Sequence, residues 1–158
     1  MSMIAPALVL GMIAGLRTLT APAVLAWAAY GAWLPVAGTW AEFLAFAYTP
    51  WILSALALGE LITDKLPQTP SRKVPIQFGA RLVSGAFCGA ILGELAGNAL
   101  LGGVAGLVGA VAGTLGGAGA RTRLADVLGN DRPAALIEDA VAIAGASLVL
   151  IAFAMVLP

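Results

Sequence analysis

Six charged residues adjoin or lie within hydrophobic runs of the chain. They are Arg17, Glu60, Asp64, Arg81, Glu138 and Asp139. An unpaired charge in a bilayer costs at least about 2.5 to 3.5 kcal/mol on insertion scales, so such residues face the interior of a helical bundle and pair there. Two interpretations stay open: an ion-paired lock that fixes the register of the helices, or a polar vestibule that binds an ion or an anionic headgroup.

The spacing of the acids limits their chemistry. Glu60 and Asp64 lie four residues apart, which puts both carboxylates on one helix face. Glu138 and Asp139 are adjacent near an expected helix N-terminus, where the helix dipole favours negative charge. Paired carboxylates can do acid–base work, but no nucleophile, phosphate-binding loop or metal set accompanies them, so the sequence predicts no enzyme. The chain has no histidine and Cys88 is its only cysteine, so we expect no metal and no cofactor, and Cys88 as a small buried hydrophobe.

The composition predicts a membrane protein. Of 158 residues, 61% are hydrophobic and 10% are charged, against about 25% charged in a soluble domain. Residues 18–41, 43–59, 95–120 and 140–158 carry no charge, and a spanning helix needs about 20 apolar residues. The formal charge is zero, which gives no basic surface for nucleic acid. We therefore predict one integral domain over residues 1–158: an all-α, polytopic transmembrane bundle of about six segments in a lipid bilayer.

The first segment must be broken. One helix from residue 3 to residue 34 would be about 48 Å long, and the hydrocarbon core is only about 30 Å thick. Pro22 suits a first helical turn, and Thr20 could cap the helix ahead of it. The pattern predicts a hairpin, as two short spans or a re-entrant pair, with Arg17 at its tip and Thr18 and Thr20 as further candidate site residues. One long, kinked helix is the alternative. Because no basic residue precedes the apolar start, we interpret it as structural and not as a signal peptide.

Four more segments follow, over residues 43–61, 78–95, 99–119 and 134–157. Pro50 should kink the first of them or mark a short approach helix. Polar loops are expected at 64–75 and 121–133. Six amphipathic aromatic residues bracket the turn at 35–42, which is more typical of an interfacial belt than of an aromatic cage: Trp27, Tyr30, Trp33, Trp40, Tyr48 and Trp51.

Basic residues predict the orientation, because short loops rich in them stay in the cytoplasm. One polar loop carries Lys65, Arg72 and Lys73, and the other carries Arg121, Arg123 and Arg132. Two spans separate these loops, which returns the second to the same side. Both loops are therefore predicted to be cytoplasmic, and both termini to lie outside.

Glycines recur at intervals of four and predict close helix packing. The series are Gly85, Gly89, Gly93 and Gly97, then Gly102 and Gly106, then Gly109, Gly113 and Gly117. Such stripes let helices approach at backbone distance in a membrane. We expect two tightly packed spans of the glycine-zipper type, with leftover stripes forming a homo-oligomer interface.

A weak internal echo divides the chain into 3–73 and 78–158. Residues 15–21 resemble residues 79–85, and acids end a span two segments later in each half. Three segments per half would give inverted halves, yet both arginines map to one side. A repeat and a coincidence of glycine-rich composition both stay open.

The chain also resembles a family of small bacterial inner-membrane proteins, the domain of unknown function 4126. The likeness lies in Gly-Leu-Arg17-Thr, in residues 59–67 and 79–85, in the glycine-rich fifth segment and in Ala-Leu-Ile-Glu138-Asp139. The resemblance implies the bacterial inner (plasma) membrane and carries no catalytic residue.

The functional hypothesis is a small transporter or channel-like protein for a small solute or ion. Arg17 and Arg81 would attract an anionic group, and the four acids would orient them or exchange protons. The alternative is a structural or accessory membrane protein with the charges as a packing lock.

Overall fold

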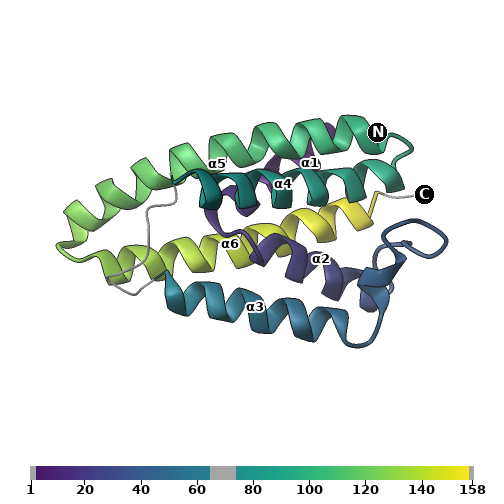
Figure 1. The fold of residues 1–158 in the computed structure, drawn as a ribbon, viewed down its shortest axis with the longest axis horizontal. Coiled ribbons are helices and arrows are strands. Elements are labelled where there is room, and N and C mark those ends of the chain that lie inside the picture. The colour runs from purple at the N-terminus through teal and green to yellow at the C-terminus, as the bar shows by residue number, and fades with distance from the viewer. Residues whose placement is uncertain (1–2, 65–73, 157–158) are drawn as a thin grey trace.

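The computed structural model describes residues 3–64 and 74–156 and is all-helical over them (Figure 1). The elements are α1 (Ile4–Leu16), α2 (Thr20–Tyr30), the 3₁₀ helix η1 (Glu42–Ala45), α3 (Thr49–Thr63), α4 (Pro75–Leu95), α5 (Ala99–Leu128) and α6 (Asp131–Ala154). The prediction of an all-α bundle with about six segments is confirmed. Lys65, Arg72 and Lys73, used above for orientation, lie outside the described residues.

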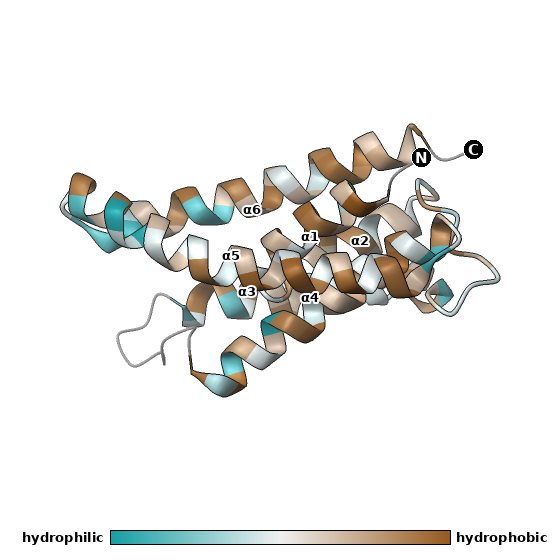
Figure 2. Ribbon diagram, turned by 90° about the horizontal axis from the view of Figure 1, so that it is seen from above, coloured by the Kyte–Doolittle hydropathy of each residue, from teal (hydrophilic) through white to brown (hydrophobic). Residues whose placement is uncertain are grey.

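Among the helices of residues 3–64 and 74–156, three are long and apolar enough to cross a membrane: α4, α5 and α6. Hydrophobic residues dominate their middle, whereas hydrophilic residues gather where α5 meets α6 (Figure 2). We call this the polar end of the bundle. The opposite end holds residues 31–48 and the turn between α4 and α5, and we call it the aromatic end. All six aromatic residues of the predicted belt are exposed, as an interfacial belt requires.

The first segment is a helical hairpin, so the single long helix is excluded. The chain leaves helical geometry between Leu16 and Thr20, and α2 then runs back towards the aromatic end, where α1 began (Figure 1). The two helices are about 20 Å and about 17 Å long at 1.5 Å per residue. Neither reaches the thickness of a hydrocarbon core, about 30 Å. The hairpin therefore has the dimensions of a re-entrant pair.

The glycine series do more than join two helices. A Cβ added to Gly89 would lie 2.2 Å from the Gly102 carbonyl oxygen, so α4 and α5 touch at backbone distance. A Cβ on Gly113 would lie 2.0 Å from the Met12 carbonyl oxygen of α1. The stripe that includes Gly102 faces α4 and the stripe that includes Gly113 faces α1. Helix α5 thus packs between two helices, where the sequence predicted one pair.

Gly117 and Gly97, which end the last and the first of those series, lie in different environments. Gly117 is buried in α5. Gly97 was predicted to pack, but it lies in the turn after α4 with a φ of +85° and no atom within 4 Å of an added Cβ. It serves the left-handed conformation that ends a helix, which is a role for which glycine is suited. The packing prediction for Gly97 is wrong.

The predicted loop at 121–133 is mostly helix. Helix α5 continues to Leu128, Gly129 ends it at a φ of +66°, and the Asn130 side chain caps α6 by accepting from the Arg132 N–H. Residues 121–128 include neither glycine nor proline, so nothing stops the helix earlier. The polar composition was mistaken for a loop, although it marks the part of α5 that extends towards the polar end.

The segment predicted at 43–61 is divided in two. Residues 42–45 form η1, and α3 begins at Thr49 with Pro50 in its first turn. Proline is tolerated there because the first N–H groups of a helix need no intrahelical partner. Pro50 therefore starts α3 and does not kink it.

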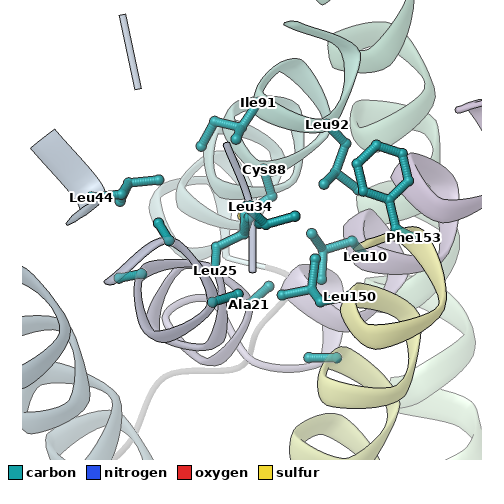
Figure 3. Close-up of a cluster of buried hydrophobic side chains, with 14 of the residues drawn as sticks. Leu10, Ala21, Leu25, Leu34, Leu44, Cys88, Ile91, Leu92, Leu150 and Phe153 are labelled. Carbon is teal, nitrogen blue, oxygen red and sulfur yellow. The ribbon is translucent and has the colours of Figure 1, made fainter. Parts of the chain in front are cut away.

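A hydrophobic core occupies the space between the hairpin break and the aromatic end. Figure 3 shows its side chains meeting from α1, α2, α4, α6 and the segment after α2. Cys88 is fully buried among them. This core lies between the aromatic end and the break, which is the non-helical turn between α1 and α2.

Candidate functional site

The six charged residues singled out from the sequence come together at the break between α1 and α2. We call Arg17, Glu60, Asp64, Arg81, Glu138 and Asp139 the charge cluster. Arg17, at the break itself, forms ion pairs with Asp64 of the segment after α3 and with Asp139 of α6, the latter at 2.6 Å from Nη2 to Oδ1. Its Nη2 also lies 3.8 Å from Oε2 of Glu138. One guanidinium thus links the hairpin to two other helices.

Arg81 completes the C-terminal end of α1. Its Nη1 donates to the carbonyl oxygens of Gly15, at 3.0 Å, and Leu16. These carbonyls have no partner within the interrupted helix, and a cation is favourable at a helix C-terminus. Nη2 of the same side chain lies 3.8 Å from Glu60 and 4.0 Å from Asp64. Arg81 therefore replaces the hydrogen bonds that the break removes from α1.

Glu60 completes the other side of the break, ahead of α2. Its two carboxylate oxygens accept from the backbone N–H of Thr18, at 2.7 Å, and of Leu19, at 2.8 Å. Backbone N–H groups at a helix start form a natural anion site. The predicted cap by Thr20 is wrong, because Thr20 is the first residue of α2 and no side chain caps the helix at Leu19. Glu60 supplies the carboxylate that makes such a cap unnecessary, and Thr20 is simply buried.

Three polar residues at the site do not follow from the charge pattern. The Ser84 hydroxyl donates to the Thr18 carbonyl, and Thr114 Oγ1 lies 3.2 Å from the Gly15 carbonyl oxygen. Ser84 could have been found from its spacing, because it lies one turn after Arg81 on the same helix face. Thr114 is a polar residue within a glycine-rich helix, which is the only signal that the sequence offers.

Arg121 is the third of these residues, and it connects the charge cluster to the polar end. It holds the exposed Asp131 in a two-pronged contact, at 2.9 Å and 2.6 Å, and its Nη1 lies 3.5 Å from buried Glu138. Beside it is a pocket of about 160 Å³ between α5 and α6, lined in part by Leu16, Arg121 and Glu138. The sequence placed Arg121 in a loop, so its distance from Glu138 could not be foreseen.

Burial sets the electrostatics of the cluster. Arg17 and Arg81 are 0% and 1% exposed, and the four acid side chains are between 8% and 13% exposed. Charges removed from water in this way interact strongly, but each carries a large desolvation penalty. Two guanidinium groups face four carboxylates, so these six described residues have a formal charge of −2. Among the described residues, no group of three His, Cys, Asp or Glu is arranged to hold a metal ion.

The cluster lies inside the helical bundle and not at its tip. Arg81 and Glu138 are each about two turns, or about 10 Å, from the start of their helices.

Comparison of the chain with protein families, with curated proteins and with solved structures finds no match. The interpretation of the site therefore depends on its geometry.

Proposed function

We propose that this protein is a small membrane transporter or channel-like protein, and that the break between α1 and α2 carries its site for a small solute or ion. The observation that supports this is the set of six ionisable side chains gathered at an interrupted helix. Discontinuous helices form the substrate and ion sites of many transporters. Ionisable residues within membrane segments are rare and mark substrate, ion or proton pathways in many such proteins.

The number of charges exceeds what the backbone of the break needs. Arg81 and Glu60 already bond the exposed carbonyl and N–H groups. Arg17, Glu138 and Asp139 add a second set of buried charges, which are joined by ion pairs between side chains. A buried ion pair is weak evidence for stability, since apolar replacements of the same volume are often as stable. The additional charges are better explained by a ligand or a proton that they handle.

Access to the site is proposed from the polar end. Asp131, Arg121 and Glu138 form a series of contacts from the surface to Arg17, beside the pocket between α5 and α6. Towards the aromatic end the hydrophobic core follows directly (Figure 3). In this proposal the solute reaches the site from the polar end, and the hydrophobic core blocks the aromatic end.

The test is flux through the purified protein in liposomes, with protons, sodium and acetate as probes. The variant is Arg17→Gln, and its matched control is Arg123→Gln, on the exposed face of α5. We expect Arg17→Gln to lower the flux at least tenfold while Arg123→Gln leaves it unchanged. Wild-type liposomes that move none of the three probes faster than empty liposomes would contradict the proposal.

A structural or accessory role with the charges as a packing lock is the second candidate. The complete burial of Arg17 and its pairing with acids of two segments favour it. A lock predicts that Arg17→Gln loses folded protein, because the acids are left buried without their cation. Size-exclusion profiles and thermal unfolding of the variant in detergent separate the two functions.

The cellular setting is also part of the proposal. We propose the bacterial inner membrane, with the segments at 64–75 and 121–133 in the cytoplasm, and a homo-oligomer. The basic residues Arg121, Arg123 and Arg132 at the polar end support this orientation. Exposed glycines of α5 that meet no neighbour, such as Gly116 and Gly119, leave a surface that a second copy could approach.

A further inference from the structure

We propose that α3 is a displaceable lid, and that Glu60 occupies the place of a carboxylate-bearing solute at the start of α2. This inference rests on the proposed transport function and names the chemistry of the solute and the moving element.

Helix α3 is the least embedded of the apolar helices. Only Pro50 and Ala57 of its fifteen residues are buried, and it packs chiefly against α2 and η1 at the edge of the bundle (Figure 1). At the aromatic end Trp51 stacks edge-on against Trp27, whose Nε1 donates to Ser54 at 2.9 Å. At the other end the attachment is ionic, through Glu60 and Asp64. A lateral displacement of α3 therefore breaks few apolar contacts. In a bilayer, the outer face of α3 would contact lipid both before and after this movement.

Glu60 is bound in the way that a free carboxylate would be. Each of its oxygens takes one backbone N–H, from Thr18 and from Leu19, and the Arg81 guanidinium lies 3.8 Å away. A second observation concerns the residue next to this position in the chain. Arg17, which directly precedes Thr18, is wholly buried, and its Nε makes no hydrogen bond with any described residue. A buried guanidinium nitrogen in that state has capacity for one more acceptor.

The charge balance identifies the sign of the solute. With α3 in place, Arg17 and Arg81 face four acids. Displacement of α3 removes Glu60 and Asp64 and leaves two arginines, two acids and two open N–H groups. These four side chains are formally neutral together, Arg121 adds a positive charge 3.5 Å from Glu138, and the N–H donors are oriented, so the site accepts an anion. A small carboxylate reproduces the bonds of Glu60 and competes with it directly.

The test measures the distance between a spin label on α3 and one on α6 by double electron–electron resonance, with the protein in lipid nanodiscs. Labels go on Ile62→Cys of α3 and Leu136→Cys of α6, both exposed, whereas Cys88 is buried and stays unlabelled. A reference pair, Val104→Cys and Leu148→Cys, reports on α5 and α6 alone. Sodium acetate, sodium phosphate and sodium chloride are compared at equal ionic strength.

In the otherwise wild-type chain, acetate is expected to produce a second, longer distance between the labels on α3 and α6. The distance of the reference pair should not change. Glu60→Gln should raise the ratio of displaced to docked α3 roughly tenfold without acetate, because hydrogen bonds to a charged group are lost. Glu94→Gln, at the far end of α4, should not. One unchanged distance at every acetate concentration overturns the lid, even if Glu60→Gln fails to fold. If chloride displaces α3 as much as acetate does, the proposed anion site at Thr18 and Leu19 is wrong. If only phosphate displaces α3, the assignment of the solute as a carboxylate is wrong.

The flux assay keeps the two proposals apart. If acetate displaces α3 but liposomes show no flux, the lid and its anion site stand and the transport proposal falls. If flux is measured while α3 stays in place, the lid is wrong and the transport proposal stands.

Discussion

Among single residues, Arg81 has the clearest physical role. One guanidinium donates to two carbonyl groups of α1 and faces two carboxylates from α3 and the segment after it. It therefore connects the break, α4 and α3. The Arg17 guanidinium also pairs with acids, but these partners are side chains, whereas Arg81 bonds the backbone of the break directly.

Arg81→Ala is expected to lower stability severely. The change removes the Arg81 hydrogen bonds to the carbonyls of Gly15 and Leu16 and leaves Glu60 without its nearby cation, while Asp64 keeps its ion pair with Arg17. Removing one partner of a buried pair costs about 3 to 5 kcal/mol. Thermal unfolding in detergent should show it, with Arg123→Ala as the exposed control. Arg81→Lys should restore only part of the loss, because an ammonium group lacks the planar fork of guanidinium. A melting temperature for Arg81→Ala equal to that of the control would show that the carbonyls are satisfied in another way.

The residues of the cluster could be predicted, but their partners could not. Charge within an apolar run is visible in the sequence, and all six such residues do meet. Which backbone groups they bond depends on where the first helix stops. Thr20 looked like a cap because threonine before proline is a local signal, whereas the actual cap, Glu60, comes from 42 residues away from Thr18. Local rules do not report a carboxylate delivered by another helix.

At the scale of elements, α5 organises the bundle through its two glycine stripes. Their close contacts with α1 and α4 position the break beside Arg81 and Thr114. The stripes were visible in the sequence, but the partner of the second stripe was not, because periodicity gives a face and does not name its neighbour. The extension of α5 past residue 120 was missed for a related reason. Polar residues were interpreted as a loop, although only Gly129 has the conformation that ends the helix.

Gly106→Ala and Gly116→Ala form a matched pair within α5. A Cβ on Gly106 would lie 2.1 Å from the Gly85 carbonyl oxygen, whereas one on Gly116 meets nothing within 4 Å. Overpacking of this kind typically costs about 1 to 3 kcal/mol, so Gly106→Ala should lower the unfolding temperature. Gly116→Ala should leave it equal or higher, since alanine favours helix. Equal effects of the two changes would mean that α4 and α5 are not in backbone contact.

At the scale of the whole molecule, the two ends of the bundle differ in chemistry. The polar end carries the α5–α6 turn with its arginines and acids, and the aromatic end carries exposed tryptophans and the turn between α4 and α5 (Figures 1 and 2). The charge cluster lies nearer the polar end, and the hydrophobic core lies between it and the aromatic end. A solute that enters from the polar end therefore meets the cluster before it meets the core.

The difference between the two ends allows a test of which end of the bundle faces the outside of the cell. Ala96→Cys lies in the turn at the aromatic end and Asp126→Cys near the polar end, and both positions are exposed. A maleimide reagent that does not cross membranes should label Ala96→Cys in intact cells and Asp126→Cys only after the membrane is opened, because loops rich in basic residues stay in the cytoplasm. The chain without either change is the control, since Cys88 is buried. The reverse pattern would place the charge cluster nearer the outside, so that the site takes up solute instead of receiving it from the cytoplasm. Labelling of both positions in intact cells would contradict a bundle that crosses the membrane between them.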